Sequence, residues 1–264
     1  MIEFSNVSMS YSSQAPLALS DVSFRIEDGE FVFIIGHSGS GKSTTIKLLS
    51  CEEQVTSGDI TIDGINISSM KRSLVPYLRR NVGMVFQDFR LIPTKTVREN
   101  VSFAMEILGE SPKKVRRQVS MVLSTVGLRS RENALPNELS GGEQQRVGIA
   151  RAMVNNPSII LADEPTGNLD PANSESIMAL LDEINRNGTT VIICTHDRYM
   201  VNRMQKRVIE ISGGKVIRDA KFAKYGDEDD YLMEVDKSDS DDTPIILRPT
   251  NETTESNFDI YYAH

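Results

Sequence analysis

The chain is predicted to adopt an α/β fold whose main sheet is mostly parallel. Short continuous apolar runs, typical of strands buried on both faces, alternate along the chain with helical patterns. A glycine-rich turn joins the first of these runs, Phe31–Ile35, to a helix that begins at Lys42. Two further runs, Ser158–Asp163 and Thr190–Thr195, end on residues that carry chemistry. Buried strands that alternate with helices build parallel sheets, because each crossover helix covers a face of the sheet.

The remaining elements follow from local patterns in chain order. Partial apolar alternation predicts two strands near the start, and an Asp-Gly pair between apolar residues predicts a hairpin. The stretch after the next strand is mainly helical and is expected to form an inserted helical subdomain over residues 88–157. The expected elements are strands at 3–9 and 18–26, a helix at 42–50, a hairpin at 60–67, a strand at 82–86, helices within 97–155 that begin at Pro112 and Ser140, a helix at 171–187, and a closing hairpin at 206–217.

Composition excludes several classes of protein. Hydrophobic residues make up 39% of the 264 residues, enough for a sizeable core. The two cysteines exclude a disulfide-rich secreted scaffold, and Cys194, inside an apolar run, is expected to be a small core residue. No apolar run reaches the roughly 18 residues of a membrane span, and the start has no secretory signal pattern. The expectation is a soluble, reduced, cytoplasmic chain.

The net charge of −8 is a property of the C-terminal end. Residues 225–264 hold 12 acidic and two basic side chains, so that residues 1–224 are close to neutral. We expect 1–224 to form the folded body and 225–264 to be a disordered acidic tail. A near-neutral body gives little support for nucleic-acid binding.

A phosphate-binding loop follows the Phe31–Ile35 strand. Residues 36–43 match the G-x-x-x-x-G-K-[ST] pattern at every fixed position, between a buried strand and a helix. Backbone N–H groups and the helix N-terminus would surround a phosphate chain, Lys42 would reach the β- and γ-phosphates, and the Ser43 hydroxyl would bind Mg²⁺. An ordinary glycine-rich turn is the less favoured alternative. The residues expected to contact the nucleotide here are Gly36, Ser38, Gly39, Ser40, Gly41, Lys42, Ser43 and Thr44.

Two other strand ends are expected to reach the same edge of the sheet. Asp163 ends one buried strand, where a carboxylate could hold Mg²⁺, and Glu164 is the candidate to orient or deprotonate the attacking water. His196 follows another. Ligands of open α/β sheets bind at the carboxyl ends of the strands. Taken alone, Asp-Glu could be a surface turn and His196 a surface or capping residue.

These features resemble the ATP-binding-cassette (ABC) family of ATPases, because Leu139–Val147 is similar to that family's signature sequence. The resemblance covers residues 2–220 and implies the P-loop cassette fold, with a small antiparallel subdomain beside the main sheet. It implies an adenine stack for Tyr11, Mg²⁺ and water contacts for Gln87, a γ-phosphate contact for His196, and a dimer-interface loop that ends at Asp170. ATP and Mg²⁺ are the implied cofactors.

The signature also has a local interpretation, since Ser140 and Glu143 form a capping box at a helix start. Capping has no need of Gly141 and Gly142, which are poor helix formers but leave N–H groups open to an anion. We therefore expect a head-to-tail homodimer in which Ser140, Gly141, Gly142 and Glu143 serve the nucleotide of the other subunit.

Within the family, the chain most resembles the cell-division cassettes, on residues 75–80, 85–92, 136–145 and 154–157. That resemblance implies an FtsX-like integral membrane protein as partner and, indirectly, control of an extracellular peptidoglycan hydrolase at the division septum. The partner would dock near residues 86–108, with Phe89, Leu91 and Ile92 as the best candidates if exposed. The alternatives are a lipoprotein-releasing or macrolide-type transport subunit and a non-hydrolysing septal scaffold.

Overall fold

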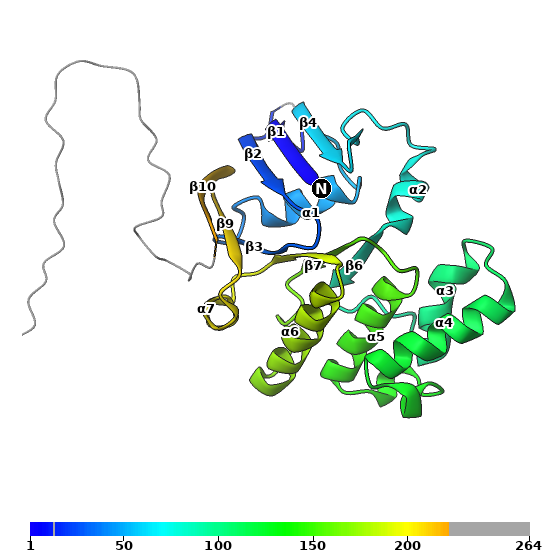
Figure 1. The fold of residues 1–264 in the computed structure, drawn as a ribbon. Helices are drawn as coiled ribbons and strands as arrows, with labels where there is room; N and C mark the ends of the chain where they lie inside the picture. The colour runs from blue at the N-terminus through cyan, green and yellow to red at the C-terminus, as the bar shows by residue number, and fades with distance from the viewer. Residues whose placement is uncertain (13, 222–264) are drawn as a thin grey trace, which may run out of the picture. The chain divides into compact units, whose positions relative to one another are not determined.

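The computed structural model describes residues 1–12 and 14–221 (Figure 1). The acidic tail expected over 225–264 lies outside the described residues, and its disorder stays a prediction. Among the described residues, no helix is both long and apolar enough to cross a membrane.

A six-stranded sheet carries the fold, and the predicted fold class is confirmed. Its strand order is β10-β9-β3-β8-β7-β6, and every pair is parallel except β9–β10. The strands are β3 (Phe31–Ile35), β6 (Val82–Phe86), β7 (Ile159–Asp163), β8 (Thr190–Cys194), β9 (Arg207–Ser212) and β10 (Lys215–Ala220). The closing hairpin is thus confirmed, with a second strand three residues longer than expected.

A second, four-stranded antiparallel sheet has the order β2-β1-β4-β5. Its strands are β1 (Ile2–Met9), β2 (Leu19–Ile26), β4 (Ser57–Ile62) and β5 (Ile65–Asn66). The hairpin expected around Asp63 is confirmed, since Ile62 pairs with Ile65 across the turn. Phe4 and Phe24 stack across β1 and β2 with ring centroids 4.3 Å apart.

Seven α-helices complete the described part of the chain. They are α1 (Lys42–Leu49), α2 (Val75–Arg80), α3 (Val97–Glu106), α4 (Pro112–Thr125), α5 (Gly141–Met153), α6 (Pro171–Arg186) and α7 (Arg198–Met204). Side chains of Thr96, Ser111 and Ser140 cap α3, α4 and α5, so local sequence sets where these helices begin. Helices α2 and α7 were not predicted from the sequence. The six residues of α2 include no buried one, and therefore leave no apolar period to detect.

The two faces of the main sheet belong to two different cores. Along β3, Phe31, Phe33 and Ile35 pack with the helices α3–α6, whereas Val32 and Ile34 pack with α1 and the antiparallel sheet. Figure 1 shows α5 and α6 on one side of this sheet, and α1 with the antiparallel sheet on the other. Because both faces are covered, the strand reads as a continuous apolar run. Cys194 of β8 is wholly buried, as expected, and burial raises the pKa of its thiol.

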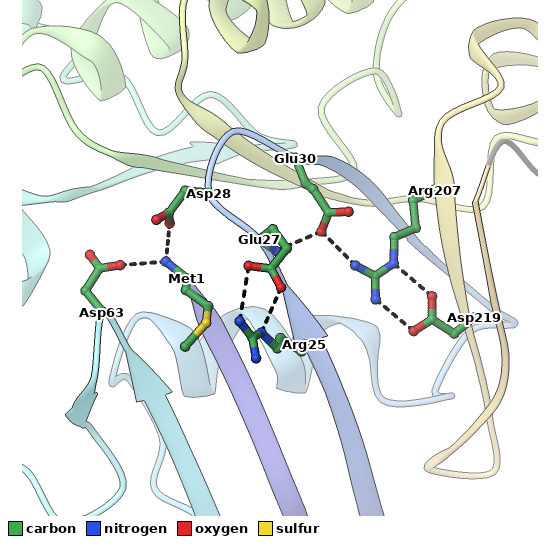
Figure 2. Close-up of polar contacts among 8 residues, drawn as sticks. All are labelled: Met1, Arg25, Glu27, Asp28, Glu30, Asp63, Arg207 and Asp219. Atoms are coloured by element: carbon green, nitrogen blue, oxygen red, sulfur yellow. Dashed lines mark hydrogen bonds and ion pairs between the residues drawn. The ribbon is translucent and has the colours of Figure 1, made fainter.

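Charged side chains connect several strand ends at the edge of the main sheet where β3 begins. Figure 2 shows the Arg207 guanidinium between Glu30, which precedes β3, and Asp219 on β10. Its Nη1 lies 2.7 Å from Glu30 and its Nη2 2.8 Å from Asp219. The Met1 amino group contacts Asp28 and Asp63 in the same view. The first of these networks ties β9 and β10 to the start of β3.

Candidate nucleotide-binding site

Four neighbouring parallel strands deliver the predicted site residues to one edge of the sheet. The phosphate loop follows β3, Glu164 follows β7, and His196 lies two residues after β8. The fourth strand, β6, ends beside Gln87. Because β3, β8, β7 and β6 are adjacent in that order, their carboxyl ends form a continuous row, as expected for an α/β ligand site.

Close contacts with neighbouring strands explain why two positions of the phosphate loop require glycine. Gly36 has φ 148°, and a Cβ there would lie 2.2 Å from the Ile211 carbonyl oxygen. Gly41, which precedes α1, has φ 116°, and its Cβ would lie 2.6 Å from a Leu19 methyl carbon. Gly39 has φ 77° and open space around it. The loop is therefore held by the antiparallel sheet and β9 as well as by its own strand and helix.

Two polar groups of the loop fit a phosphate ligand. Lys42 is buried, and its Nζ donates to the carbonyl oxygens of Gly36 at 2.8 Å and His37 at 3.0 Å. The Ser40 hydroxyl is buried and has no hydrogen-bond partner among the described residues. A buried hydroxyl without a partner is costly, and an acceptor oxygen in the loop would satisfy it.

Ser43 and Asp163 form a hard-oxygen pair across the sheet edge. The Ser43 hydroxyl donates to Asp163 Oδ1 at 3.2 Å. Burial raises the pKa of Asp163, the Ser43 hydrogen bond opposes that shift, and the charge of Glu164 adds to it. A bound cation would offset the cost of burying this carboxylate. No cluster of three or more His, Cys, Asp or Glu with metal-holding geometry occurs in residues 1–12 and 14–221. One carboxylate plus a hydroxyl is the sparse protein ligand set of Mg²⁺ sites that rely on substrate phosphates and water.

Glu164 is positioned by β8 and by His196. Its φ is 47°, a left-handed conformation that is uncommon for non-glycine residues and clusters at functional sites. Its backbone N–H donates to the Cys194 carbonyl at 2.9 Å. The carboxylate lies 2.8 Å from His196 Nδ1 and also accepts from the His196 backbone N–H at 3.4 Å. The carboxylate is largely covered and the imidazole is 70% exposed, so Glu164 is held in place while His196 remains accessible.

Tyr11, two residues after β1, lies beside the start of α1, and half of its surface is exposed. Its hydroxyl is 3.0 Å from the Thr44 hydroxyl, and the Lys47 ammonium lies 5.3 Å from the ring centroid. These contacts place the Tyr11 ring next to the phosphate loop. The family resemblance implied an adenine contact for this residue.

The signature residues form the N-terminus of α5, and the capping box between Ser140 and Glu143 is confirmed. Ser140 N donates to the Glu143 carboxylate at 2.8 Å, and Glu143 N donates back to the Ser140 hydroxyl at 3.3 Å. Within the described residues, no hydrogen bond joins residues 140–142 to the phosphate loop of the same chain. From the sequence, we expected that nothing within one subunit requires glycine at position 142. This expectation is corrected, because a Cβ there would lie 2.3 Å from Asn173 Oδ1. Gly142 therefore has a packing role against α6.

Asp170 is the N-cap of α6, since its side chain accepts from the Asn173 N–H at 3.0 Å. This local role accompanies the dimer-loop role that the resemblance implies.

Two contacts escaped the sequence analysis because their partners are far apart in the chain. Gln87 Nε2 donates to Asn168 Oδ1 at 3.3 Å, and Asn168 Nδ2 donates to the Gln87 carbonyl at 3.0 Å. Gln87 is thus tied to the loop before α6, and in the described part of the chain its side chain has no hydrogen bond to Ser43 or Asp163. Arg151 on α5 donates to the carbonyl oxygens of Phe89 and Arg90, both of which have positive φ.

The apolar side chains after Gln87 differ from the expectation. Phe89, Leu91 and Ile92 are only partly exposed, and Leu91 packs on the core. The exposed apolar side chains of this region are instead Phe103 on α3 and Ile107, which caps the C-terminal end of that helix. A groove of about 360 Å³ opens beside β6, between α2, α3 and α5.

Comparisons with known proteins agree with this geometry. The ABC transporter family model matches residues 19–167. The chain is 52% identical over 226 residues to the cell division ATP-binding protein FtsE of Mycobacterium tuberculosis, covering 86% of this chain and 98% of the relative. It is 48% identical over 229 residues to FtsE of Bacillus subtilis, covering 87% of this chain and 100% of that protein.

Solved structures show the same fold. The dimeric ABC transporter cassette MJ0796 is 40% identical, with a TM-score of 0.77 over 85% of this chain and 100% of that one. The same cassette bound to ADP and Pi, described as a dimeric post-hydrolysis state, gives a TM-score of 0.76 at 38% identity, again over 85% of this chain and all of that one. The phosphate loop, the row of strand ends and these relatives together show that the chain belongs to the ABC transporter family, as an ATP-binding, ATP-hydrolysing cassette of the FtsE type.

Proposed function

We propose that this chain is the ATP-hydrolysing subunit of a cell-division complex and acts with an FtsX-like integral membrane protein. The observation that carries the proposal is the extent of the likeness to FtsE, about half of all residues identical over nearly the whole length of those proteins. The row of strand ends supplies the chemistry that such a subunit needs.

The proposed roles follow the geometry of the site. Lys42, the loop N–H groups and the Ser40 hydroxyl would bind the phosphates, while Tyr11 would stack on adenine. Ser43 and Asp163 would hold Mg²⁺, which would neutralise charge that develops on the phosphates, and Gln87 would complete the set after leaving Asn168. Glu164, oriented by His196, would position the attacking water and accept its proton.

The functional unit proposed is an ATP-bound homodimer. Ser140, Gly141 and Gly142 present the N-terminus of α5, while Asp170 caps α6. Among the described residues, none of the four has a hydrogen bond to the phosphate loop of its own chain. A second subunit would bring these N–H groups to the γ-phosphate held by the first. The dimeric state of MJ0796 supports this arrangement.

The closing and opening of the dimer would be transmitted to the membrane partner. The groove beside β6 lies next to the loop that holds Gln87, and it is the proposed docking site for a cytoplasmic segment of that partner. The complex would hold the chain at the cytoplasmic face of the membrane, at the division septum, and would control an extracellular peptidoglycan hydrolase.

The test compares wild type with Glu164→Gln, in the presence and absence of the FtsX-like protein. We expect ATP hydrolysis to fall by about 10²- to 10⁴-fold in the variant, because the proton acceptor is lost while the binding loop is intact. We also expect the variant to elute as an ATP-dependent dimer on size exclusion with light scattering. Glu183→Gln, on the exposed face of α6, is the matched control and should retain wild-type hydrolysis.

Two results would redirect the proposal. If wild type and variant both bind ATP and neither hydrolyses it with the membrane protein present, the septal scaffold becomes the better account of the complex. If the chain instead co-purifies with a transporter and no hydrolase, a lipoprotein-releasing or macrolide-type role replaces it.

A further inference from the structure

One side of α4 carries a cluster of basic side chains. Residues 112–129 hold five basic residues and no acidic one. Lys113, Arg116 and Arg117 are exposed, and because the two arginines lie three and four residues after the lysine, all three share the outward face of the helix. The opposite face is apolar and buried, so α4 is an amphipathic helix with a cationic outer side.

Two further side chains extend this surface. Met121 is 52% exposed and lies one turn after Arg117 on the same face. Arg129 follows the helix and donates to the Ser120 carbonyl at 3.2 Å, which brings another cation to α4. We call the surface formed by these side chains the basic face, and its members are Lys113, Arg116, Arg117, Met121 and Arg129.

Acidic side chains do not neutralise the basic face. The other basic residue of this stretch, Lys114, pairs with Glu110 at 2.6 Å. In residues 1–12 and 14–221, by contrast, the side chains of Lys113, Arg116 and Arg117 have neither an ion pair nor a hydrogen bond. The remaining arginine of the basic face donates only to a backbone carbonyl. These positive charges are therefore available to a ligand outside the folded body.

The helix itself disfavours this arrangement of charge. Like charges three and four residues apart repel each other on a helix surface. The N-terminal turn of a helix also carries partial positive charge, yet the first turn of α4 holds two lysines and no acidic residue. An anion next to the basic face would reduce both repulsions, so the face is suited to an external anionic surface.

We propose that the basic face binds the anionic headgroups of a phospholipid bilayer. Clusters of four or more basic residues on an amphipathic helix are typical of such binding. Met121 among the cations, and Ile107, 67% exposed at the end of α3, favour a bilayer over a nucleic acid, because apolar side chains can lie at the boundary between headgroups and acyl chains. The inference goes beyond the proposed function, since lipid would bind this chain directly and without a protein partner.

The place of α4 in the fold is compatible with membrane contact. Gln118 of this helix donates to Asn156 at 2.8 Å, and the neighbouring Asn155 donates to the Ala104 carbonyl at 3.3 Å. Asn155 and Ala104 line the groove beside β6, so α4 lies at the end of that groove. A membrane protein seated in the groove would therefore hold the basic face near the bilayer in which that protein resides.

The first test is flotation of the full chain with vesicles. We expect wild type to bind vesicles of equal parts phosphatidylglycerol and phosphatidylcholine about tenfold or more tightly than pure phosphatidylcholine, and to bind more weakly as salt concentration rises. Arg116→Glu combined with Arg117→Glu should weaken this binding about tenfold or more. Arg25→Glu combined with Arg186→Glu is the matched control, because both arginines are exposed and the change in net charge is the same. Both double variants should keep wild-type ATPase activity without vesicles, which shows that they fold.

A fluorescence probe tests the apolar part of the contact. The chain has no tryptophan, so Met121→Trp introduces a single one on the basic face. Its emission should shift to shorter wavelength on phosphatidylglycerol vesicles, because the indole enters a less polar environment. Ile65→Trp is the control, since Ile65 is 58% exposed on β5 of the antiparallel sheet, and its emission should not shift.

Three results would separate the possible explanations. If the double variant of the basic face floats like wild type, or if pure phosphatidylcholine binds as tightly, the inference is wrong while the proposed function stands. If a DNA oligonucleotide binds wild type more tightly than the vesicles do and the emission of Met121→Trp does not shift on lipid, a nucleic acid is the occupant and the inference is overturned. If the chain binds the vesicles as expected but never binds the FtsX-like protein, the inference is supported and the proposed function fails.

Discussion

Individual backbone conformations determine the shape of the sheet edge that carries Glu164 and the phosphate loop. Glu164 has a left-handed φ of 47°, and its backbone N–H donates to the Cys194 carbonyl at the end of β8. The carboxylate is then fixed by His196 rather than by solvent. Strain of this kind costs about 1–3 kcal/mol and persists only where surrounding contacts impose it.

Two glycines of the phosphate loop allow the cost of a close contact to be separated from the cost of a positive φ alone. Gly36→Ala should lower the free energy of unfolding by about 3 kcal/mol or more, because the new Cβ would meet the Ile211 carbonyl at 2.2 Å. Gly39→Ala should cost only about 1–2 kcal/mol, since its φ is positive but no atom lies within 4 Å. Urea denaturation without nucleotide measures both, and equal losses would contradict the close-contact explanation.

At the scale of elements, helix N-termini combine capping with packing. Ser140 and Asp170 are the N-caps of α5 and α6, and their side chains satisfy N–H groups of the first turns of these helices. Asn173 links the two helices, because its amide bonds to Asp170 and occupies the space over Gly142. A nucleotide-facing role for Gly142 therefore has to be separated from its packing role.

A double variant makes that separation. Gly142→Ala alone should lose about 1–3 kcal/mol of stability through overpacking. Adding Asn173→Ala removes the blocking amide, and urea denaturation should then show less destabilisation than the sum of the two single variants. If Gly142 also faces the nucleotide of a second subunit, ATPase activity of the double variant stays low. Recovery of both stability and activity would limit Gly142 to packing, and Asn173→Ala alone serves as the control.

Capping carboxylates give the helices a pH-dependent stability. Hydrogen bonds from Thr96 lower the pKa of Glu99 at the start of α3, and those from Ser140 lower the pKa of Glu143 at the start of α5. A lowered folded-state pKa means that the stabilisation is complete above the unfolded pKa and is lost as pH falls through the folded value. The urea midpoint should therefore decrease below about pH 5. Glu99→Gln, which keeps the cap but does not titrate, should show a weaker decrease, and an unchanged pH profile would contradict this assignment.

At the scale of the molecule, contacts between loops connect the groove beside β6 to the nucleotide site. Gln87 and Asn168 exchange two hydrogen bonds, and a Cβ on Gly167 would lie 2.8 Å from Gln87 Nε2. The loop after β6 and the loop before α6 are therefore joined by a close, hydrogen-bonded contact. Packed, hydrogen-bonded contacts of this kind can carry coupling between two sites.

Asn168→Ala should uncouple the two loops. We expect ATP affinity of the isolated chain to change by less than about twofold, while stimulation of hydrolysis by the membrane protein falls about threefold or more. Steady-state ATPase assays with and without partner make the comparison. Gln118→Ala removes a similar pair, in which Gln118 donates to Asn156 at 2.8 Å, and should leave stimulation intact. Equal stimulation of Asn168→Ala and wild type would exclude this contact from the coupling.

The sequence alone determined those features that depend on neighbouring residues. The buried strands, the phosphate loop and the Ser140–Glu143 cap are all set by short-range patterns, because backbone period, turn geometry and capping act within a few residues. Their alternation was also sufficient to place three functional strand ends on one edge, since parallel strands point the same way.

Tertiary structure alone decided which distant groups meet. Asn173 over Gly142, Asn168 on Gln87 and Arg151 on the Phe89 carbonyl join residues 31, 81 and 62 positions apart. No local pattern specifies such contacts, because they depend on how helices pack on the finished sheet. The groove beside β6 is of the same kind, because its lining residues come from separate segments that gather only when α2, α3 and α5 pack around that strand.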